Sequence, residues 1–232
     1  MKKKLIFSVA LILSLGLTGC GNSETKDESK KEFQQTVDTG NTKNKETTQE
    51  SKKSDENEVK DGVLSKPGQW TKEDNGSKVT LVKINETKQT HDLGPIKLTI
   101  ESVKLFQYTD LPEKDIELYK TNYDKDVTNG LNAIQILYSV ENTTDTNVMF
   151  HTVDTVTTDT KAQIQGLDNI AMSDDTGTYK GKVIVDGVSI LPYFSGPIED
   201  INSVNIITSD VWDLDSKMPS SLNSSQKIEI AL

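Results

Sequence analysis

The chain has 232 residues, a formal net charge of −10 and 26 basic residues, all of which are lysine. Nucleic-acid binding depends on basic patches that neutralise phosphates, and arginine grips phosphate bidentately, so this composition argues against a nucleic-acid partner. A single cysteine, Cys20, leaves no second thiol for an intramolecular disulfide or for a thiolate zinc site.

Residues 1–20 have the features of an export signal. A positive start, Lys2 to Lys4, precedes the apolar run Leu5 to Leu17, which is shorter than the roughly 20 residues that a membrane-spanning helix requires. This combination is typical of a cleaved signal peptide. The signal ends in Leu17, Thr18, Gly19 and Cys20, a tetrapeptide that resembles the lipobox of bacterial lipoproteins.

The resemblance implies that residues 1–19 are a lipoprotein signal peptide and that Cys20 carries a diacylglyceryl thioether after cleavage. Two acyl chains hold a protein on a membrane durably, whereas one chain binds only marginally. Lysine without arginine hints at an A+T-rich genome, so we expect the protein on the outer face of the cytoplasmic membrane of a Gram-positive bacterium. The alternative is a secreted protein in which Cys20 has no special role.

Residues 20–62 are expected to form a disordered tether. After Cys20, the large apolar residues of this segment are Phe33, Val37 and Val59, too few to offset the entropy of ordering the chain. As a flexible coil the segment spans roughly 35 to 40 Å from end to end. The remainder, residues 63–232, has the length of one ordinary domain with a real core.

Alternation of apolar and polar residues with period 2 predicts half-buried β-strands throughout this domain. Clusters rich in Gly, Asn, Asp and Pro separate the segments, as in an antiparallel sandwich. The parity of the alternation changes between Ile100 and Val103 and again across Gly187, which predicts a β-bulge or bend at each place. The predicted strands include residues 79–81, 96–100, 134–140, 183–185, 204–206 and 228–232.

One short helix is predicted from about Pro112 to Lys120, in a loop between two strands. Asp110 is its candidate N-cap, and Ile116 and Tyr119 share one face.

Two segments resemble the small immunoglobulin-like domains of unknown function on lipoproteins and secreted proteins of Gram-positive bacteria. They are residues 134–145, a strand that ends in an Asn-Thr turn, and residues 178–185, a strand entered through a glycine. The resemblance extends from about Lys88 to the C-terminus, and the acidic insertion from Asp110 to Asp126 departs from it. It implies an all-β, immunoglobulin-like antiparallel sandwich without a disulfide, and no agreed activity.

Catalytic patterns are weak. His151 precedes Asp154 by three residues, but no Gly-x-Ser-x-Gly motif accompanies the pair. The Ser-x-x-Lys pair Ser224 and Lys227 directly precedes a predicted strand instead of opening a helix, and no Lys-Thr-Gly triplet occurs. We therefore predict no catalytic residue and no resident cofactor.

Acidic loops offer candidate calcium ligands, because calcium prefers several oxygen ligands. The residues are Asp124 and Asp126 in one cluster, and Asp210, Asp213 and Asp215 around Trp212 in another. Solvated acidic loops that keep the protein soluble are the simpler interpretation.

Aromatic side chains offer a second kind of candidate site. Trp212, Tyr193 and Phe194 could form a platform for a sugar or a peptide, although aromatic residues of a β domain more often belong to its core.

These observations predict a membrane-anchored surface lipoprotein whose immunoglobulin-like domain is a non-enzymatic binding module. Its partners are expected to be the membrane, through the lipid, and an extracellular protein, wall polymer or small ligand. The alternatives are a cell-envelope enzyme or a calcium-dependent module that uses loop carboxylates.

Overall fold

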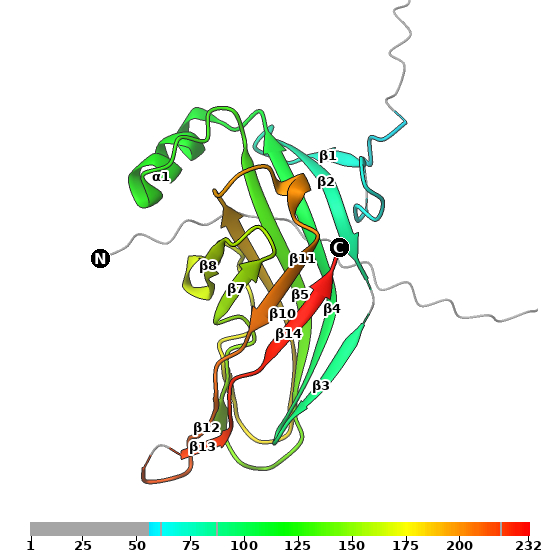
Figure 1. Ribbon diagram of the computed structural model, residues 1–232. Helices are drawn as coiled ribbons and strands as arrows, with labels where there is room; N and C mark the ends of the chain where they lie inside the picture. The colour runs from blue at the N-terminus through cyan, green and yellow to red at the C-terminus, as the bar shows by residue number, and fades with distance from the viewer. Residues whose placement is uncertain (1–55, 61, 87, 219) are drawn as a thin grey trace, which may run out of the picture. The chain divides into compact units, whose positions relative to one another are not determined.

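The computed structural model describes residues 56–60, 62–86, 88–218 and 220–232, and Figure 1 shows their course. The predicted signal peptide, Cys20 and the tether up to residue 55 lie outside the described residues and stay predictions. In the part of the chain that is described, no helix is long and apolar enough to cross a membrane.

The large sheet has six strands and is antiparallel throughout. Its longest strand, β4 (Ile96–Thr109), pairs with β5 (Leu131–Asn142) along one side and with both β2 (Lys78–Asn85) and β3 (Gln89–Leu93) along the other. The strand order is β1 (Trp70–Lys72), β2 (Lys78–Asn85), β4 (Ile96–Thr109), β5 (Leu131–Asn142) and β10 (Val183–Tyr193), with β3 (Gln89–Leu93) beside β4.

Two four-stranded sheets complete the fold. The opposing sheet has the order β14 (Lys227–Ala231), β11 (Ser203–Ile207), β7 (Thr155–Thr158) and β8 (Gln163–Gln165). The end sheet has the order β13 (Ser220–Asn223), β12 (Val211–Asp213), β6 (Val148–Met149) and β9 (Thr178–Tyr179). Two 3₁₀ turns, η1 (Gly166–Asp168) and η2 (Ile198–Asp200), lie in the connections.

The large and opposing sheets pack face to face around one hydrophobic core. Buried side chains of both belong to the same cluster, because alternate residues of each strand point inward. The predicted all-β architecture, an antiparallel sandwich with one short helix in an insertion, is therefore confirmed. Representative core residues are Leu98, Ile134 and Leu191 of the large sheet and Val156, Val204 and Ile228 of the opposing sheet.

The predicted helix is present as α1 (Glu113–Tyr123), between β4 and β5. It begins after Pro112, whose fixed φ suits the first turn, so the expectation that Asp110 caps it is wrong. Asp110 instead has a left-handed φ of 55° in the turn that leaves β4. The helix also runs three residues beyond the predicted end at Lys120, because Tyr123 packs in the same cluster as Tyr119.

One of the two predicted strand irregularities is present. The pairing of β4 with β5 shifts between Ile100 and Ser102, which lets both Ile100 and Val103 point into the core. The irregularity predicted at Gly187 is wrong, because β10 pairs with β5 through Gly187 without a shift. A Cβ on Gly187 would lie 2.3 Å from Cε2 of its partner Tyr138, so the glycine makes room for the tyrosine ring.

The chain enters the sandwich before residue 63. The amide of Val59 donates to the carbonyl of Trp70 over 2.8 Å, and Val59 packs against a second cluster that contains Leu64 and Phe106. Lys104 is 5% exposed there and donates from Nζ to the carbonyl of Leu64 over 2.8 Å. Burial lowers the pKa of Lys104.

Replacing Gly187 should destabilise the fold. In Gly187→Ala the new methyl group overlaps the buried ring of Tyr138, so we expect the free energy of unfolding to fall by about 1–3 kcal/mol. Chemical denaturation measures the change, and Asp186→Ala, at the exposed neighbouring position of β10, is the matched control. Equal unfolding midpoints for the two variants would contradict this account of Gly187.

Candidate functional site

The end sheet presents one row of side chains outward. Met149 of β6 lies opposite Trp212 of β12 on one side and Thr178 of β9 on the other, and Trp212 lies opposite Ser221 of β13. Directly opposed residues project on the same face of a sheet. The adjacent row contains Tyr179 and Val148, both of which are buried in the core, so the row through Trp212 faces solvent.

A leucine side chain extends this surface. The amide of Leu214 donates to the carbonyl of Asn147 over 2.9 Å, which continues the pairing of β12 with β6 by one residue. Leu214 is two residues beyond Trp212 and so lies on the same face. Leu222 lies at the register shift of β13 and is also exposed, but no pairing places it in the row of Trp212. We call Met149, Trp212 and Leu214 together the Trp212 face.

Three of the predicted calcium ligands lie at the two ends of β12, near the Trp212 face, and each carboxylate accepts backbone hydrogen bonds. Asp213 is opposite Val148 and so projects on the other side of the sheet from Trp212. Asp210 accepts from the amide of Ser225 over 2.7 Å, and Asp213 from the amide of Asp215 over 2.8 Å. Asp215 accepts from both the backbone amide and the side-chain amide of Asn147, over 2.8 and 2.7 Å. These bonds hold the ends of β12 and the turn after it.

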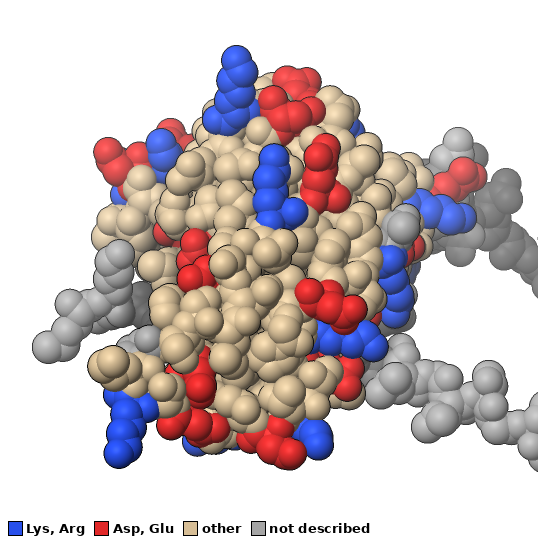
Figure 2. Space-filling model, turned by 60° about the horizontal axis from the view of Figure 1, so that its bottom comes forward, with Lys and Arg blue, Asp and Glu red and all other residues tan. Residues whose placement is uncertain are grey.

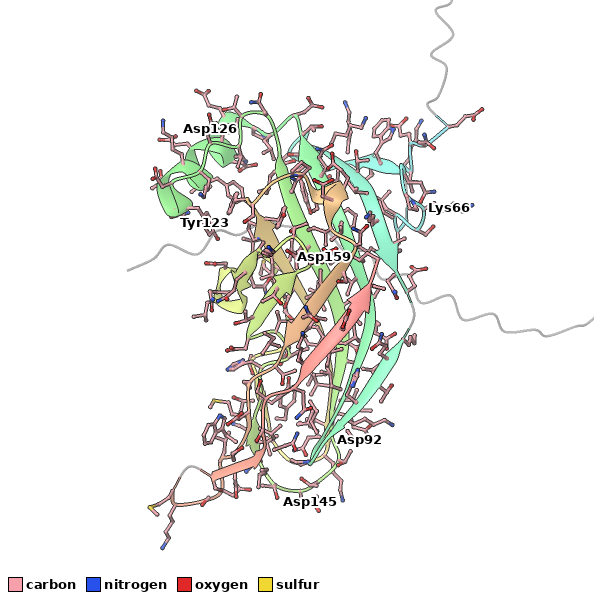
Figure 3. The ribbon with its side chains drawn as sticks, in the orientation of Figure 1. Lys66, Asp92, Tyr123, Asp126, Asp145 and Asp159 are labelled. Atoms are coloured by element: carbon pink, nitrogen blue, oxygen red, sulfur yellow. The ribbon has the colours of Figure 1, made fainter. Side chains whose placement is uncertain are left out.

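The other predicted calcium ligands lie at the far end of the domain, beside α1 (Figure 3). Asp124 is the C-cap of α1, with a left-handed φ of 53°. Asp126 accepts from the hydroxyl and the amide of Thr128 over 2.5 and 2.9 Å, and these bonds lower the pKa of Asp126.

Calcium binding by either cluster stays a prediction. Within the described ranges, no three His, Cys, Asp or Glu residues are grouped so that they could hold a metal ion.

The three aromatic residues do not form one platform, because they lie in different places, and Tyr193 and Phe194 pack in the interior as aromatic residues of a β domain more often do. Tyr193 is 2% exposed, and its hydroxyl reaches the partly buried site where it lies 3.1 Å from Oγ1 of Thr160. Phe194 packs against Tyr119 and Tyr123 of α1. Of the three, Trp212 alone belongs to the outward face of the end sheet, and the residues that accompany it there, Met149 and Leu214, were not foreseen.

The two histidines are placed differently from each other. His151 is exposed, its amide donates to Oγ of Ser209 over 2.8 Å, and its imidazole lies against Gly177. Among the described residues, no hydrogen bond joins His151 to Asp154. His91, on β3, has a buried Nε2 without a hydrogen-bond partner in the described chain.

Asp175 forms a polar clasp that sequence reasoning missed. Its two carboxylate oxygens accept from the hydroxyls of Tyr138 and Tyr179, over 3.0 and 2.7 Å, and one of them also accepts from the amide of Gly177 over 2.8 Å. Burial raises the pKa of both tyrosines, and the charge of Asp175 raises it further. The phenols therefore stay protonated and donate.

Asp175 lies near the end of residues 169–177, a segment that we call the strap. The strap covers part of β10, the edge strand of the large sheet. Oδ1 of Asn169 accepts from the amide of Ile190 over 2.8 Å, and Oγ of Ser173 accepts from the amide of Val188 over 3.3 Å. Unpaired edge amides invite pairing with another chain. The strap satisfies these two amides of β10 and so protects this edge.

Comparison with known proteins leaves the function open. No family model and no curated protein matches the chain. Among solved structures, the chain is similar to a functionally unknown protein from Listeria monocytogenes EGD-e, with 15% identity and a TM-score of 0.47 over 66% of this chain and 86% of that one. This likeness carries no argument about function.

Removing the clasp should loosen the strap. Asp175→Ala removes the carboxylate that accepts from two buried phenols, so we expect a loss of about 2–4 kcal/mol of stability. Hydrogen exchange should also accelerate at the amides of Val188 and Ile190. Asp174→Ala, at the exposed neighbouring position, is the control. Unchanged protection of both amides in Asp175→Ala would show that the clasp does not hold the strap.

Raising the pH should unfold the domain through its buried tyrosines. Burial raises the pKa of Tyr119, Tyr138 and Tyr179 in the folded state, whereas an unfolded tyrosine ionises near pH 10. The stability that the buried phenols contribute is therefore complete below about pH 10 and is lost as the pH rises above it. We expect tyrosinate absorbance to appear together with the loss of β-sheet circular dichroism. Full ionisation of an intact fold near pH 10 would refute this.

Proposed function

We propose that the protein is a lipid-anchored surface protein that presents a non-enzymatic β-sandwich on the outer face of the cytoplasmic membrane of a Gram-positive bacterium. The module would bind an extracellular protein, a wall polymer or a small ligand, and nucleic acid is not among its expected partners. The single observation that carries the anchoring is the tetrapeptide Leu17-Thr18-Gly19-Cys20 after a charged and then apolar leader.

The solvent-exposed surface supports a binding role. Monomeric soluble proteins rarely gather large apolar side chains on one exposed patch unless the patch binds something. The Trp212 face places a tryptophan, a methionine and a leucine on adjacent strands, next to hydrogen-bonding groups such as Asn147 and Thr178. A face with apolar and polar groups together suits recognition of a partner.

The sandwich supplies a rigid base for that face. The inner side of the end sheet is continuous with the main core through Val148, Tyr179 and Val211. The turn after β12 is held by the bonds of Asp213 and Asp215 described above. Binding groups on such a base lose less conformational entropy than groups on a free loop.

Metabolic labelling with a radioactive fatty acid tests the anchor. The parent chain should be labelled and should sediment with membranes, whereas Cys20→Ala should be unlabelled and released, because the diacylglyceryl group needs the thiol. Ser23→Ala, three residues further on, is the matched control and should behave as the parent. Equal labelling of Cys20→Ala and the parent would refute lipidation at Cys20.

A further inference from the structure

We propose that the Trp212 face docks a cationic, amphipathic peptide segment of a partner protein. The inference rests on the proposed function and names the class of partner that the module would bind. Three independent features of the described chain lead to it: where the exposed apolar side chains gather, where that surface lies relative to the start of the domain, and which charges surround it.

Exposed apolar side chains concentrate at the end sheet. The described chain has eight exposed large hydrophobic residues, and four of them belong to the end sheet or to the turn between β12 and β13: Met149, Leu214, Met218 and Leu222. Trp212, on β12, is half-buried and lies directly opposite Met149 on β6. Side chains at opposed positions are about 4.5–5.5 Å apart at Cβ, so Met149 and Trp212 form one continuous surface, which Leu214 extends.

This surface lies at the opposite end of the sandwich from the point where the chain enters it (Figure 1). The first strands, β1 and β2, meet at Lys78, which pairs with Thr109 at one end of β4. At the other end of β4, a Cβ on Gly94 would lie 3.4 Å from the carbonyl oxygen of Leu222 on β13. The 14 residues of β4 place roughly 40 Å between the two ends.

Charge makes the membrane an unsuitable occupant. The carboxylates beside the Trp212 face would be repelled by anionic lipid headgroups. A partner in the surrounding envelope is therefore favoured over the bilayer.

The charges around the surface favour a cationic partner. Asp210, Asp213 and Asp215 accept hydrogen bonds from uncharged N–H groups, which leave their negative charge in place. None of the three ion pairs of the described chain involves them, and the lysine of the same turn, Lys217, forms no ion pair. Figure 2, which turns this end forward, shows a largely uncharged area with acidic and basic side chains at its margins.

A second copy of this chain fits the surface poorly. An isologous dimer would bring the same three aspartates of both copies together, and each chain carries a net charge of −10. Like charges across an interface oppose association. A peptide that alternates apolar and basic residues would instead place its apolar side chains on Trp212 and Met149 and its basic side chains beside the aspartates.

A fluorescence titration tests the proposal with Trp212 as the reporter. The chain has two tryptophans, so Trp70→Phe leaves Trp212 alone. The protein is the chain from residue 20 with Cys20→Ser, which makes the result independent of lipidation. The probe is a short capped peptide of alternating lysine and leucine, and the matched probe has glutamate in place of lysine.

We expect the lysine peptide to shift the emission of Trp212 to shorter wavelength in a saturable way, and the glutamate peptide to leave it unchanged. Binding should weaken about tenfold between low salt and physiological salt, because Asp215 is exposed and Asp210 and Asp213 are only partly buried. The double variant Met149→Ser, Leu214→Ser should bind about tenfold more weakly. Asp210→Asn, whose amide oxygen can still accept the hydrogen bond from the amide of Ser225, should reduce the dependence on salt.

Ile184→Ser is the matched apolar control, since Ile184 is 68% exposed on the large sheet and outside the Trp212 face. Equal binding of both peptides, equal loss in Ile184→Ser, or a shift produced by a chitin oligosaccharide and not by the peptide would overturn the proposal. So would a Trp212 shift that follows protein concentration alone, which indicates self-association. If these outcomes occur while Cys20→Ala still loses its lipid label, the anchor stands and only the docking proposal fails.

Discussion

The pairing of β4 with β5 is the constraint on which the rest of the structure depends. It extends over nearly the whole length of both strands, from Ile96 to Tyr108 on β4, and its register decides which side chains of the large sheet enter the core. β2 and β3 pair with the side of β4 that faces away from β5, and β10 pairs with the side of β5 that faces away from β4. Because the same ladder joins the β1 end to the end sheet, it also separates the point of entry of the chain from the Trp212 face.

Hydrogen bonds to side chains hold the connections between these strands, because Cys20 is the only cysteine of the chain and no disulfide can do so. Asp175 binds two tyrosines and one amide, and Asn169 and Ser173 cover two amides of β10. Each of these acceptors bonds donors that would otherwise be buried without a partner or stay unpaired at a sheet edge. The loops that carry them are thereby fixed relative to the core.

The sequence predicts the long elements well because their periodic patterns are local. Residues 134–140 alternate within a single strand, and the change of parity after Ile100 marks a real bulge. The end sheet could not be predicted, since β6, β9 and β12 have only two or three residues each and no period can be read from so few. The role of Gly187 could not be predicted for a different reason. The glycine makes room for the ring of Tyr138, a residue far away in sequence.

The sequence predicts the candidate site only in part. It singles out Trp212, whereas Met149 and Leu214 join Trp212 only through the pairing of β12 with β6. The central claim is that this face of an anchored sandwich meets the partner. Site-specific photo-crosslinking on intact cells tests it most directly, with the photoreactive residue at position 149 or, as the control, at position 184. The account predicts a discrete crosslinked protein with a basic segment from position 149 and none from position 184. Equal products from both positions, or none from position 149, would contradict it.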